Sequence, residues 1–211
     1  MKKKGAGDFF KKLWYLLWKD ESLKGWIFSI IFLFIFIKFI FFPGLSLVTG
    51  TELPLAIVES CSMYHKANVF SNFNNWWERH DLKYADFSID EVVFSNFVFK
   101  RGFSKGDILF IVRAKPEKLE LGDVIIFDAS PAYPNPLIHR IIEIKQEDGK
   151  FVFSTIGDNN NGQLSVEREI PEDKLVGKAV FRIAPFVGWG KLIFYDWRNP
   201  VSERGFCGEN Q

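Results

Sequence analysis

The stretch GDVIIFDASPAYPNPLIHRIIEIK, residues 122–145, decides the fold. It contains two short runs rich in Ile, and Asp, Pro and Asn residues cluster between them. Runs of this composition favour β-strands, and such clusters are typical of the turns that join strands. Pro134 and Pro136 confine the connecting segment to a loop or a sheet edge. The stretch therefore predicts two neighbouring β-strands.

Similar runs lie on both sides of this pair. They read DILFIVRA (107–114), KFVFSTIG (150–157) and LVGKAVFRIA (175–184), and turn-forming clusters such as KGD, LGD, EDGK and GDNNNG bound the strands. Five or more short strands with turns at this spacing predict a mainly β domain, built as a coiled sheet or a partly open β-barrel. The 211 residues have room for one such domain plus an appendage. The sequence contains no internal repeat, phosphate-binding loop or GxGxxG motif.

An apolar run, WIFSIIFLFIFIKFIFF, precedes the β-rich region at residues 26–42. Its only residues that are not apolar are Ser29 and Lys38, and Pro43 is expected to end the helix. The run predicts a transmembrane helix over 26–43, because a helix apolar on every side needs a larger domain than this one to bury it. A small-x-small cleavage site is missing after it, so we expect the helix to be retained.

Charge sets the expected orientation of this helix. Residues 1–25 carry seven lysines against three acids, whereas residues 44–58 carry Glu52 as their only charge. The positive-inside rule then leaves the N-terminus in the cytoplasm and residues 44–211 outside it, at the cell membrane. Apolar residues recur at helical spacing among the lysines of 1–25, which indicates an amphipathic helix on the inner leaflet; a disordered basic tail is the alternative.

Composition excludes several classes of function. The net charge is only +1, from 27 basic and 26 acidic residues, so nucleic acid is not an expected partner. Two cysteines, Cys61 and Cys207, support neither a disulfide framework nor a cysteine-based zinc site, although a single bridge between them remains open. We interpret His65 and His80 as surface or polar-interface residues and expect no metal site and no cofactor.

Residues 64–104 interrupt the β-rich pattern with many aromatic residues but no long periodic apolar face. We interpret this segment as an aromatic-rich insertion. Phe73, Trp76 and Trp77 have two alternatives: they lie at the lipid headgroup level, where aromatic rings are favoured, or they cap the core of the β domain.

Three polar segments stand at the edges of the predicted strands: ESCSM (59–63), LIHR (137–140) and TIGDNN (155–160). Together they supply Ser62 as a nucleophile, His139 as a base for its proton, and a carboxylate to hold the imidazole tautomer. Most domains contain a Ser, a His and an Asp, so these residues alone are a weak signal.

The order and surroundings of these segments resemble the type I signal peptidases. The matching pieces are the ESCSM box, the KGD strand at 105–109, the GD strand at 122–127, the HR strand at 138–141, the GDNN turn at 157–160, and the closing VG and PxxG segments at 176–178 and 185–189. The resemblance covers residues 54 to about 194. His139 stands where bacterial members have Lys, which is similar to the archaeal enzymes and to the catalytic subunit of the endoplasmic-reticulum complex.

The resemblance implies roles for individual residues. Ser62 is the implied nucleophile and His139 the general base, and Asp158 of the GDNN turn takes the third role, with Glu167 or no acid as alternatives. Ser60 is implied as an oxyanion donor with the backbone N–H of Ser62.

Two positions in this sequence depart from the family pattern. Cys61 replaces the family's Gly, which raises the question of a thiol nucleophile, and Leu164 replaces a second Asp. Met63, next to Ser62, is expected at the oxyanion or substrate-binding site.

The function implied is a membrane-bound serine endopeptidase that removes signal peptides from exported proteins after small residues at the outer membrane face. Its expected partners are preproteins and the lipid bilayer, and the resemblance allows the translocation machinery as a further partner. The competing class is a catalytically inactive, membrane-tethered β module that binds other molecules.

Overall fold

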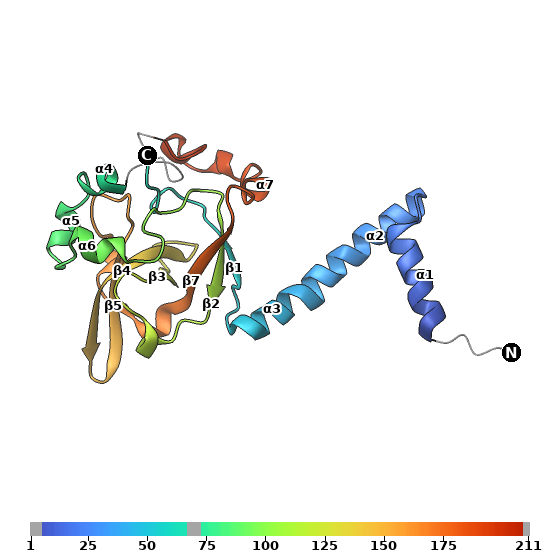
Figure 1. The fold of residues 1–211 in the computed structure, drawn as a ribbon, viewed down its shortest axis with the longest axis horizontal. Coiled ribbons are helices and arrows are strands. Elements are labelled where there is room, and N and C mark those ends of the chain that lie inside the picture. The colour runs from blue at the N-terminus through green and yellow to red at the C-terminus, as the bar shows by residue number, and fades with distance from the viewer. Residues whose placement is uncertain (1–5, 67–72, 209–211) are drawn as a thin grey trace. The chain divides into compact units, whose positions relative to one another are not determined.

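A computed structural model describes residues 6–66 and 73–208 of this chain (Figure 1). The chain divides into two compact units, Met1–Val48 and Thr49–Gln211.

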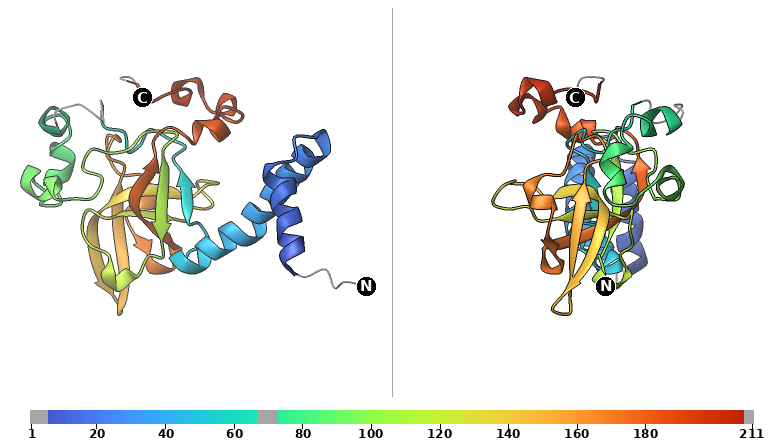
Figure 2. Two further views of the ribbon diagram at one scale, coloured as in Figure 1. Left: turned by 45° about the vertical axis from the view of Figure 1, so that its right-hand side comes forward. Right: turned by 90° about the vertical axis from the view of Figure 1, so that its left-hand side faces the viewer.

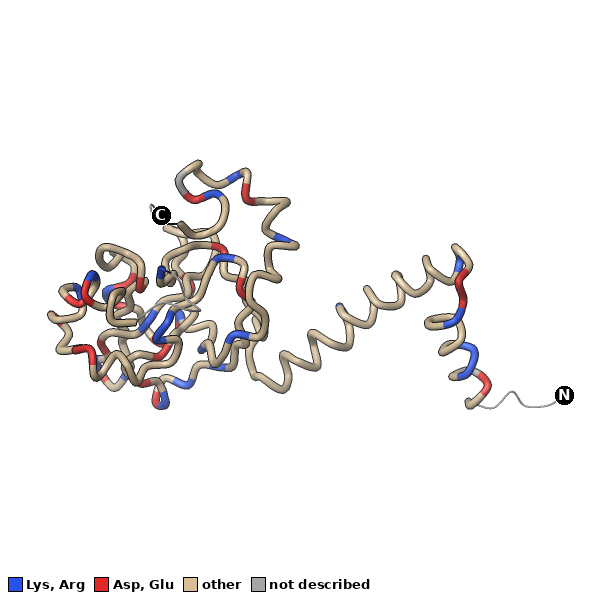
Figure 3. The backbone as a smooth tube through the Cα atoms, turned by 45° about the horizontal axis from the view of Figure 1, so that its top comes forward, with Lys and Arg blue, Asp and Glu red and all other residues tan. Residues whose placement is uncertain are grey.

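The N-terminal unit is helical. Helix α1 (Ala6–Trp18) lies within residues 1–25, where a helix was predicted, and residues 19–22 after it are not helical. Helix α2 (Leu23–Phe36), the π-helical turn η1 (Ile37–Phe41) and α3 (Phe42–Thr49) then form one continuous helix. The Ser22 Oγ atom caps α2 by accepting a hydrogen bond from the Gly25 N–H at 3.1 Å. Within the described residues, Leu23–Thr49 is the one helix long and apolar enough to cross a membrane. Figure 3 shows it without acidic residues.

The prediction that Pro43 ends this helix was wrong. A proline inside a helix lacks the N–H donor and its ring crowds the carbonyl one turn earlier. The chain accommodates Pro43 in α3 by widening the turn before it, where the Phe42 N–H donates to the carbonyl of Ile37, five residues back. Local π-helical adjustment of this kind is one way in which apolar helices tolerate proline.

The C-terminal unit is built on one antiparallel sheet, which confirms the mainly β prediction. Its strands are β1 (Leu55–Ile57), β2 (Ile108–Val112), β3 (Val124–Phe127), β4 (Leu137–Glu147), β5 (Lys150–Ile156), β6 (Ile170–Pro171) and β7 (Leu175–Ala184). Their spatial order is β1-β2-β7-β3-β4-β5-β6, so β1 and β6 are the edges. All five predicted runs form strands, and the two short edge strands, β1 and β6, are not among those runs.

Both faces of this sheet are buried. Val124 and Ile126 of β3 pack in one apolar cluster with Met63 and Phe103, whereas Ile125 and Phe127 pack in another with Ile141. Because successive side chains of a strand point to opposite faces, the two clusters lie on opposite sides of the sheet.

The insertion at 64–104 folds into the short helices α4 (Phe73–Trp77), α5 (Leu82–Ala85) and α6 (Glu91–Ser95), apart from residues 67–72, which lie outside the described residues. Trp76 and Trp77 are buried there and cluster with Tyr84, Phe94, Ile142 and Ile156. The structure therefore supports the core-capping alternative for Trp76 and Trp77, because buried rings do not face lipid.

The remaining helical turns are short. They are η2 (Pro116–Lys118), η3 (Ser165–Glu167), η4 (Glu172–Lys174), α7 (Trp189–Leu192), η5 (Asp196–Arg198) and η6 (Val201–Glu203). Figure 2 shows the last three as one red segment that follows β7.

Candidate active site

The loop that carries Ser62 leaves the edge strand β1 and is held from two directions. The backbone N–H of Gly106 donates to the carbonyl of Val58 at 2.8 Å, and the N–H of Asn159 donates to the carbonyl of Ser62 at 2.7 Å. A Cβ atom at Gly157 would lie 2.9 Å from that same Ser62 carbonyl oxygen. Glycine at 157 thus allows the GDNN turn to pack directly behind the Ser62 loop.

The structure brings Ser62 and His139 together. The Nε2 atom of His139 lies 2.8 Å from the Oγ atom of Ser62, although the two residues are 77 positions apart in the chain. His139 is 2% exposed on β4, whereas Ser62 is half-buried in its loop. This is the distance at which an imidazole takes the proton of a hydroxyl.

A buried carboxylate completes this arrangement, and it belongs to Glu167. Its Oε1 atom lies 2.5 Å from the Nδ1 atom of His139 and 3.1 Å from the Oγ1 atom of Thr155. The Oε2 atom accepts a hydrogen bond from the backbone N–H of Leu164 at 2.7 Å. With both oxygens hydrogen-bonded, Glu167 is placed to hold the Nδ1–H tautomer of His139, which leaves Nε2 free to accept the Ser62 proton.

Asp158 does not approach His139, contrary to the expectation from the GDNN motif. Its carboxylate is fully buried and binds Arg140, with Oδ1 at 2.8 Å from Nε and Oδ2 at 2.7 Å from Nη2. Tyr84 donates its hydroxyl to Oδ1 at 3.0 Å. The physical reason is that His139 and Arg140 are successive residues of β4, so Asp158, which binds Arg140, lies on the face of the sheet opposite to the His139 imidazole.

Burial opposes ionisation of Asp158, but Arg140 and His65 outweigh it and hold the pKa of the carboxyl far below its ordinary value. His65 lies 2.8 Å from Oδ2 of Asp158 and is itself buried, with its ring stacked on Trp76 at 3.6 Å between centroids. Burial lowers the pKa of His65 more than Asp158 raises it. The contact is therefore a buried hydrogen bond between the His65 ring and the Asp158 carboxylate.

His65 is thus an internal polar residue at the interface between the insertion and the β domain. His80 also lies in the insertion and is half-buried, and its Nδ1 atom is 2.7 Å from the carbonyl oxygen of Trp76. Burial lowers the pKa of His80. Within residues 6–66 and 73–208, no three His, Cys, Asp or Glu side chains gather as metal ligands.

Ser60 lies beside Ser62, with 3.1 Å between their Oγ atoms, and it is exposed. Met63 is different: it is 1% exposed in the apolar core, and its Sδ atom lies 3.3 Å from the backbone N–H of Asp158. Its side chain supports the loop from inside and is not open to a substrate.

Cys61 and Cys207 form a disulfide across 146 positions of the chain. The bridge ties the residue between Ser60 and Ser62 to the C-terminal segment. A disulfide sulfur is not a nucleophile, so this pairing speaks against attack by a Cys61 thiol.

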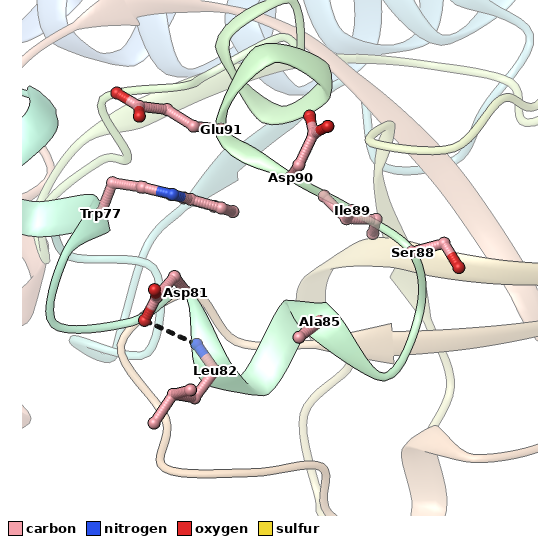
Figure 4. Close-up of a pocket in the computed structure, with 8 residues that line it drawn as sticks. All are labelled: Trp77, Asp81, Leu82, Ala85, Ser88, Ile89, Asp90 and Glu91. Atoms are coloured by element: carbon pink, nitrogen blue, oxygen red, sulfur yellow. Dashed lines mark hydrogen bonds between the residues drawn. The ribbon is translucent and has the colours of Figure 1, made fainter.

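A pocket of about 400 Å³ lies within the insertion, apart from the Ser62 loop (Figure 4). Trp77, Asp81, Leu82 and Asp90 are among its lining residues. Asp81 and Asp90 are N-caps of α5 and α6, accepting hydrogen bonds from Leu82 and Val93, so their carboxylates serve the local fold.

Sequence similarity to known proteins supports the same class of enzyme. No family model matches the chain. The signal peptidase complex catalytic subunits SEC11C of Homo sapiens, Canis lupus familiaris and Mus musculus are each 29% identical over 105 residues, which is 45% of this chain and 52% of theirs. The chain spans about half the length of the curated relatives it matches. It is homologous to the catalytic subunit of the endoplasmic-reticulum complex, and this homology supports a type I signal peptidase of the endoplasmic-reticulum and archaeal type.

Proposed function

We propose that this chain is a membrane-bound serine endopeptidase that removes signal peptides from exported proteins, cutting after small residues at the outer membrane face. The observation that carries the proposal is the contact of the Ser62 hydroxyl with His139 Nε2 at 2.8 Å, while Glu167 lies against Nδ1 of the same ring. Homology to the SEC11C subunits supports the same reaction class.

The reaction begins when Ser62 Oγ attacks the scissile carbonyl and His139 Nε2 takes its proton. Glu167 stabilises the resulting imidazolium. The tetrahedral intermediate then expels the amine of the mature protein, which receives the proton from His139, and an acyl-enzyme on Ser62 remains. A water molecule then attacks this ester and gives a proton to His139. Collapse of the second tetrahedral intermediate returns that proton to the Ser62 oxygen and frees the signal peptide.

Oxyanion stabilisation falls to groups beside Ser62. The Ser60 hydroxyl, 3.1 Å from the Ser62 hydroxyl, is exposed and able to donate to the developing oxyanion together with the backbone N–H of Ser62. A preorganised donor of this kind contributes about 3 kcal/mol to transition-state stabilisation. Removing the Ser60 hydroxyl should therefore slow the reaction without abolishing it.

The edge strand β1 suits an extended substrate. It pairs with β2 on one side and ends the sheet on the other, and it leads directly into the Ser62 loop. A peptide that adds to this edge would gain main-chain hydrogen bonds, and alternate side chains would face the protein.

Two features support an anchored, extracytoplasmic site. The apolar helix Leu23–Thr49 is long enough to span a bilayer, and lysines dominate the charge before it. The Cys61–Cys207 disulfide fits an oxidising compartment, because thiols in the cytosol are kept reduced.

The full chain in detergent, mixed with a preprotein, tests the proposal. We expect cleavage after a small residue by the native chain and by a Ser95→Ala control on α6, and none by Ser62→Ala. Cleavage that survives in purified Ser62→Ala would contradict the assignment. A native chain that binds preproteins but never cleaves them would instead favour the tethered binding module.

A further inference from the structure

Lys83 of helix α5 links the aromatic insertion to the GDNN turn, which packs behind the Ser62 loop. Its Nζ atom donates hydrogen bonds to the backbone carbonyl oxygens of Asp158 and Asn160, at 2.5 and 2.9 Å. These two residues stand on either side of Asn159 in the turn. The side chain of Lys83 is half-buried, so its ammonium group spends its hydrogen bonds on the protein rather than on bulk water. One ammonium group therefore fixes the backbone of the turn at two points.

Asn159, between the two residues that Lys83 binds, contacts the Ser62 loop through both its backbone and its side chain. Its backbone N–H donates to the carbonyl of Ser62 at 2.7 Å, and its Nδ2 atom donates to the carbonyl of Cys61 at 3.1 Å. The backbone N–H of Tyr64 donates to the same Cys61 carbonyl at 3.0 Å. The Cys61 carbonyl and the Ser62 N–H belong to one planar peptide unit, so the groups that hold this carbonyl also set the direction of that N–H.

The Ser62 N–H is the backbone donor to the oxyanion in the reaction described above. Such a donor accelerates the reaction only when it already points at the place where the negative charge develops. Lys83 acts on the same group in a second way. The Asp158 carbonyl and the Asn159 N–H are the two ends of another peptide unit, and an ammonium bound at its oxygen strengthens its N–H as a donor to Ser62.

We propose that Lys83 is a positioning residue for oxyanion stabilisation and acts through Asn159 on the peptide unit that carries the Ser62 N–H. The inference rests on the proposed function and deepens it, because it gives the aromatic insertion a part in the reaction. The hydrogen bonds of Lys83 go to the turn and not to the reacting atoms. Its loss should therefore act on the transition state more than on substrate binding at the edge strand β1, and so on kcat more than on KM.

Steady-state kinetics on Lys83→Met test the proposal. Methionine keeps an apolar stem of similar length and removes the ammonium. On a soluble signal-peptide substrate in detergent, we expect kcat to fall about tenfold or more, short of the loss of about 10²–10³-fold that follows outright removal of an oxyanion donor. KM should change little.

Lys100→Met is the matched control. Lys100 also belongs to the insertion and also donates to a backbone carbonyl, that of Ser95, at 2.9 Å, but it does not bind the GDNN turn. Its kcat and KM should stay native. An unchanged kcat in Lys83→Met, or an equal loss in Lys100→Met, would overturn the proposal.

The charge of Lys83 supplies a second measurement. Burial lowers the pKa of its ammonium to about 8, although the nearby carboxylate of the turn opposes this shift. The charged and titratable groups around the ammonium are Asp158, Arg140, His80 and Tyr84. Burial lowers the pKa of His80 and raises that of Tyr84. Between about pH 7 and 9, Lys83 is therefore the member of this group that changes charge.

The pH dependence of kcat should follow this change of charge. For the native chain, kcat should fall as the pH rises through about 8, because the ammonium loses its proton. Lys83→Arg keeps its charge over this range, so it should recover much of the native kcat and show no such fall. Lys83→Met should also show no fall, at its lower kcat. A fall of the native size that persists in Lys83→Met would overturn the proposal.

A double-mutant cycle tests the path through Asn159. Asn159→Ala removes the hydrogen bond to the Cys61 carbonyl and should also lower kcat. If Lys83 acts through Asn159, the loss in the double variant should be smaller than the product of the two single losses. A loss equal to that product would show that the two residues act independently, and would overturn the proposed path.

A peptide aldehyde separates this inference from the proposed function. Ser62 Oγ adds to the aldehyde carbon, and the resulting hemiacetal oxygen lies where the oxyanion forms. Lys83→Met should bind this aldehyde more weakly than the native chain by about the factor lost in kcat, because the aldehyde resembles the transition state. Equal aldehyde affinity in the two chains would overturn this inference alone. A native chain that neither cleaves preproteins nor binds the aldehyde would overturn the proposed function, and this inference with it.

Discussion

His139 and Arg140 are neighbours on β4, yet their side chains bind different carboxylates on opposite faces of the sheet. His139 meets Glu167, and Arg140 meets Asp158. Successive residues of a strand point to opposite faces, so one carboxylate cannot serve both side chains. The two carboxylates therefore have different roles. We infer that Glu167 orients the His139 base, whereas Asp158 joins the insertion to the sheet behind the Ser62 loop.

These different roles predict that substituting Glu167 mainly lowers kcat, whereas substituting Asp158 mainly lowers the unfolding free energy. Glu167→Gln should lower kcat by up to about 10⁴-fold, because an amide no longer selects the Nδ1–H tautomer or stabilises the imidazolium. Its unfolding free energy should change less than that of Asp158→Asn. Steady-state kinetics and urea unfolding on both variants check this. A Glu167→Gln chain with native kcat would remove Glu167 from the mechanism.

Asp158 should dominate stability instead. Asp158→Asn leaves Arg140 buried without its anion, which typically costs about 3–5 kcal/mol. Urea unfolding of the β domain at neutral pH measures the loss. A conservative control is Asp173→Asn, on the half-exposed turn η4, which should cost almost nothing.

Acid should act through the same carboxyl. The pKa of Asp158 is lower in the folded chain than in the unfolded one, so the unfolded chain takes up a proton first as the pH falls. The stabilisation by Asp158 is therefore complete above the unfolded pKa of about 4 and is lost below it. Between pH 6 and 3, the melting temperature of the native chain should fall more steeply than that of Asp158→Asn. Equal slopes would contradict the assignment.

Lysine at position 139 tests whether the site requires an imidazole as its general base. His139→Lys brings in the residue found at this position in bacterial members, but its ammonium cannot occupy the planar site between Ser62 and Glu167 in the same geometry. We expect weak cleavage at best at neutral pH, measured on a soluble peptide substrate. Full activity would show that the base is not tied to the Glu167 contact.

The disulfide should stabilise the Ser62 loop. Replacing both Cys61 and Cys207 by Ser should lower the unfolding free energy by about 2–5 kcal/mol and slow cleavage, because the loop loses its covalent link to the C-terminal segment. Thiol labelling of the denatured, unreduced native chain should detect no free thiol. Two labelled thiols would show that the bridge does not form in solution.

The sequence by itself determined the strands, the apolar helix and the residues offered for catalysis. Strand runs and turn clusters are local signals, and the order of six short motifs pointed to Ser62 and His139 before any distance was known. Glu167 remained one alternative among several, because its motif carries no distinctive neighbour and Asp158 stands in a recognisable turn.

Tertiary structure decided which groups meet. It decided that Asp158 faces Arg140, that Cys61 pairs with a cysteine 146 positions away, and that Trp76 and Trp77 close a core and do not face lipid. Each of these depends on which face of the sheet a loop crosses after leaving its strand. That choice depends on packing between residues far apart in the chain, and local sequence patterns do not encode it.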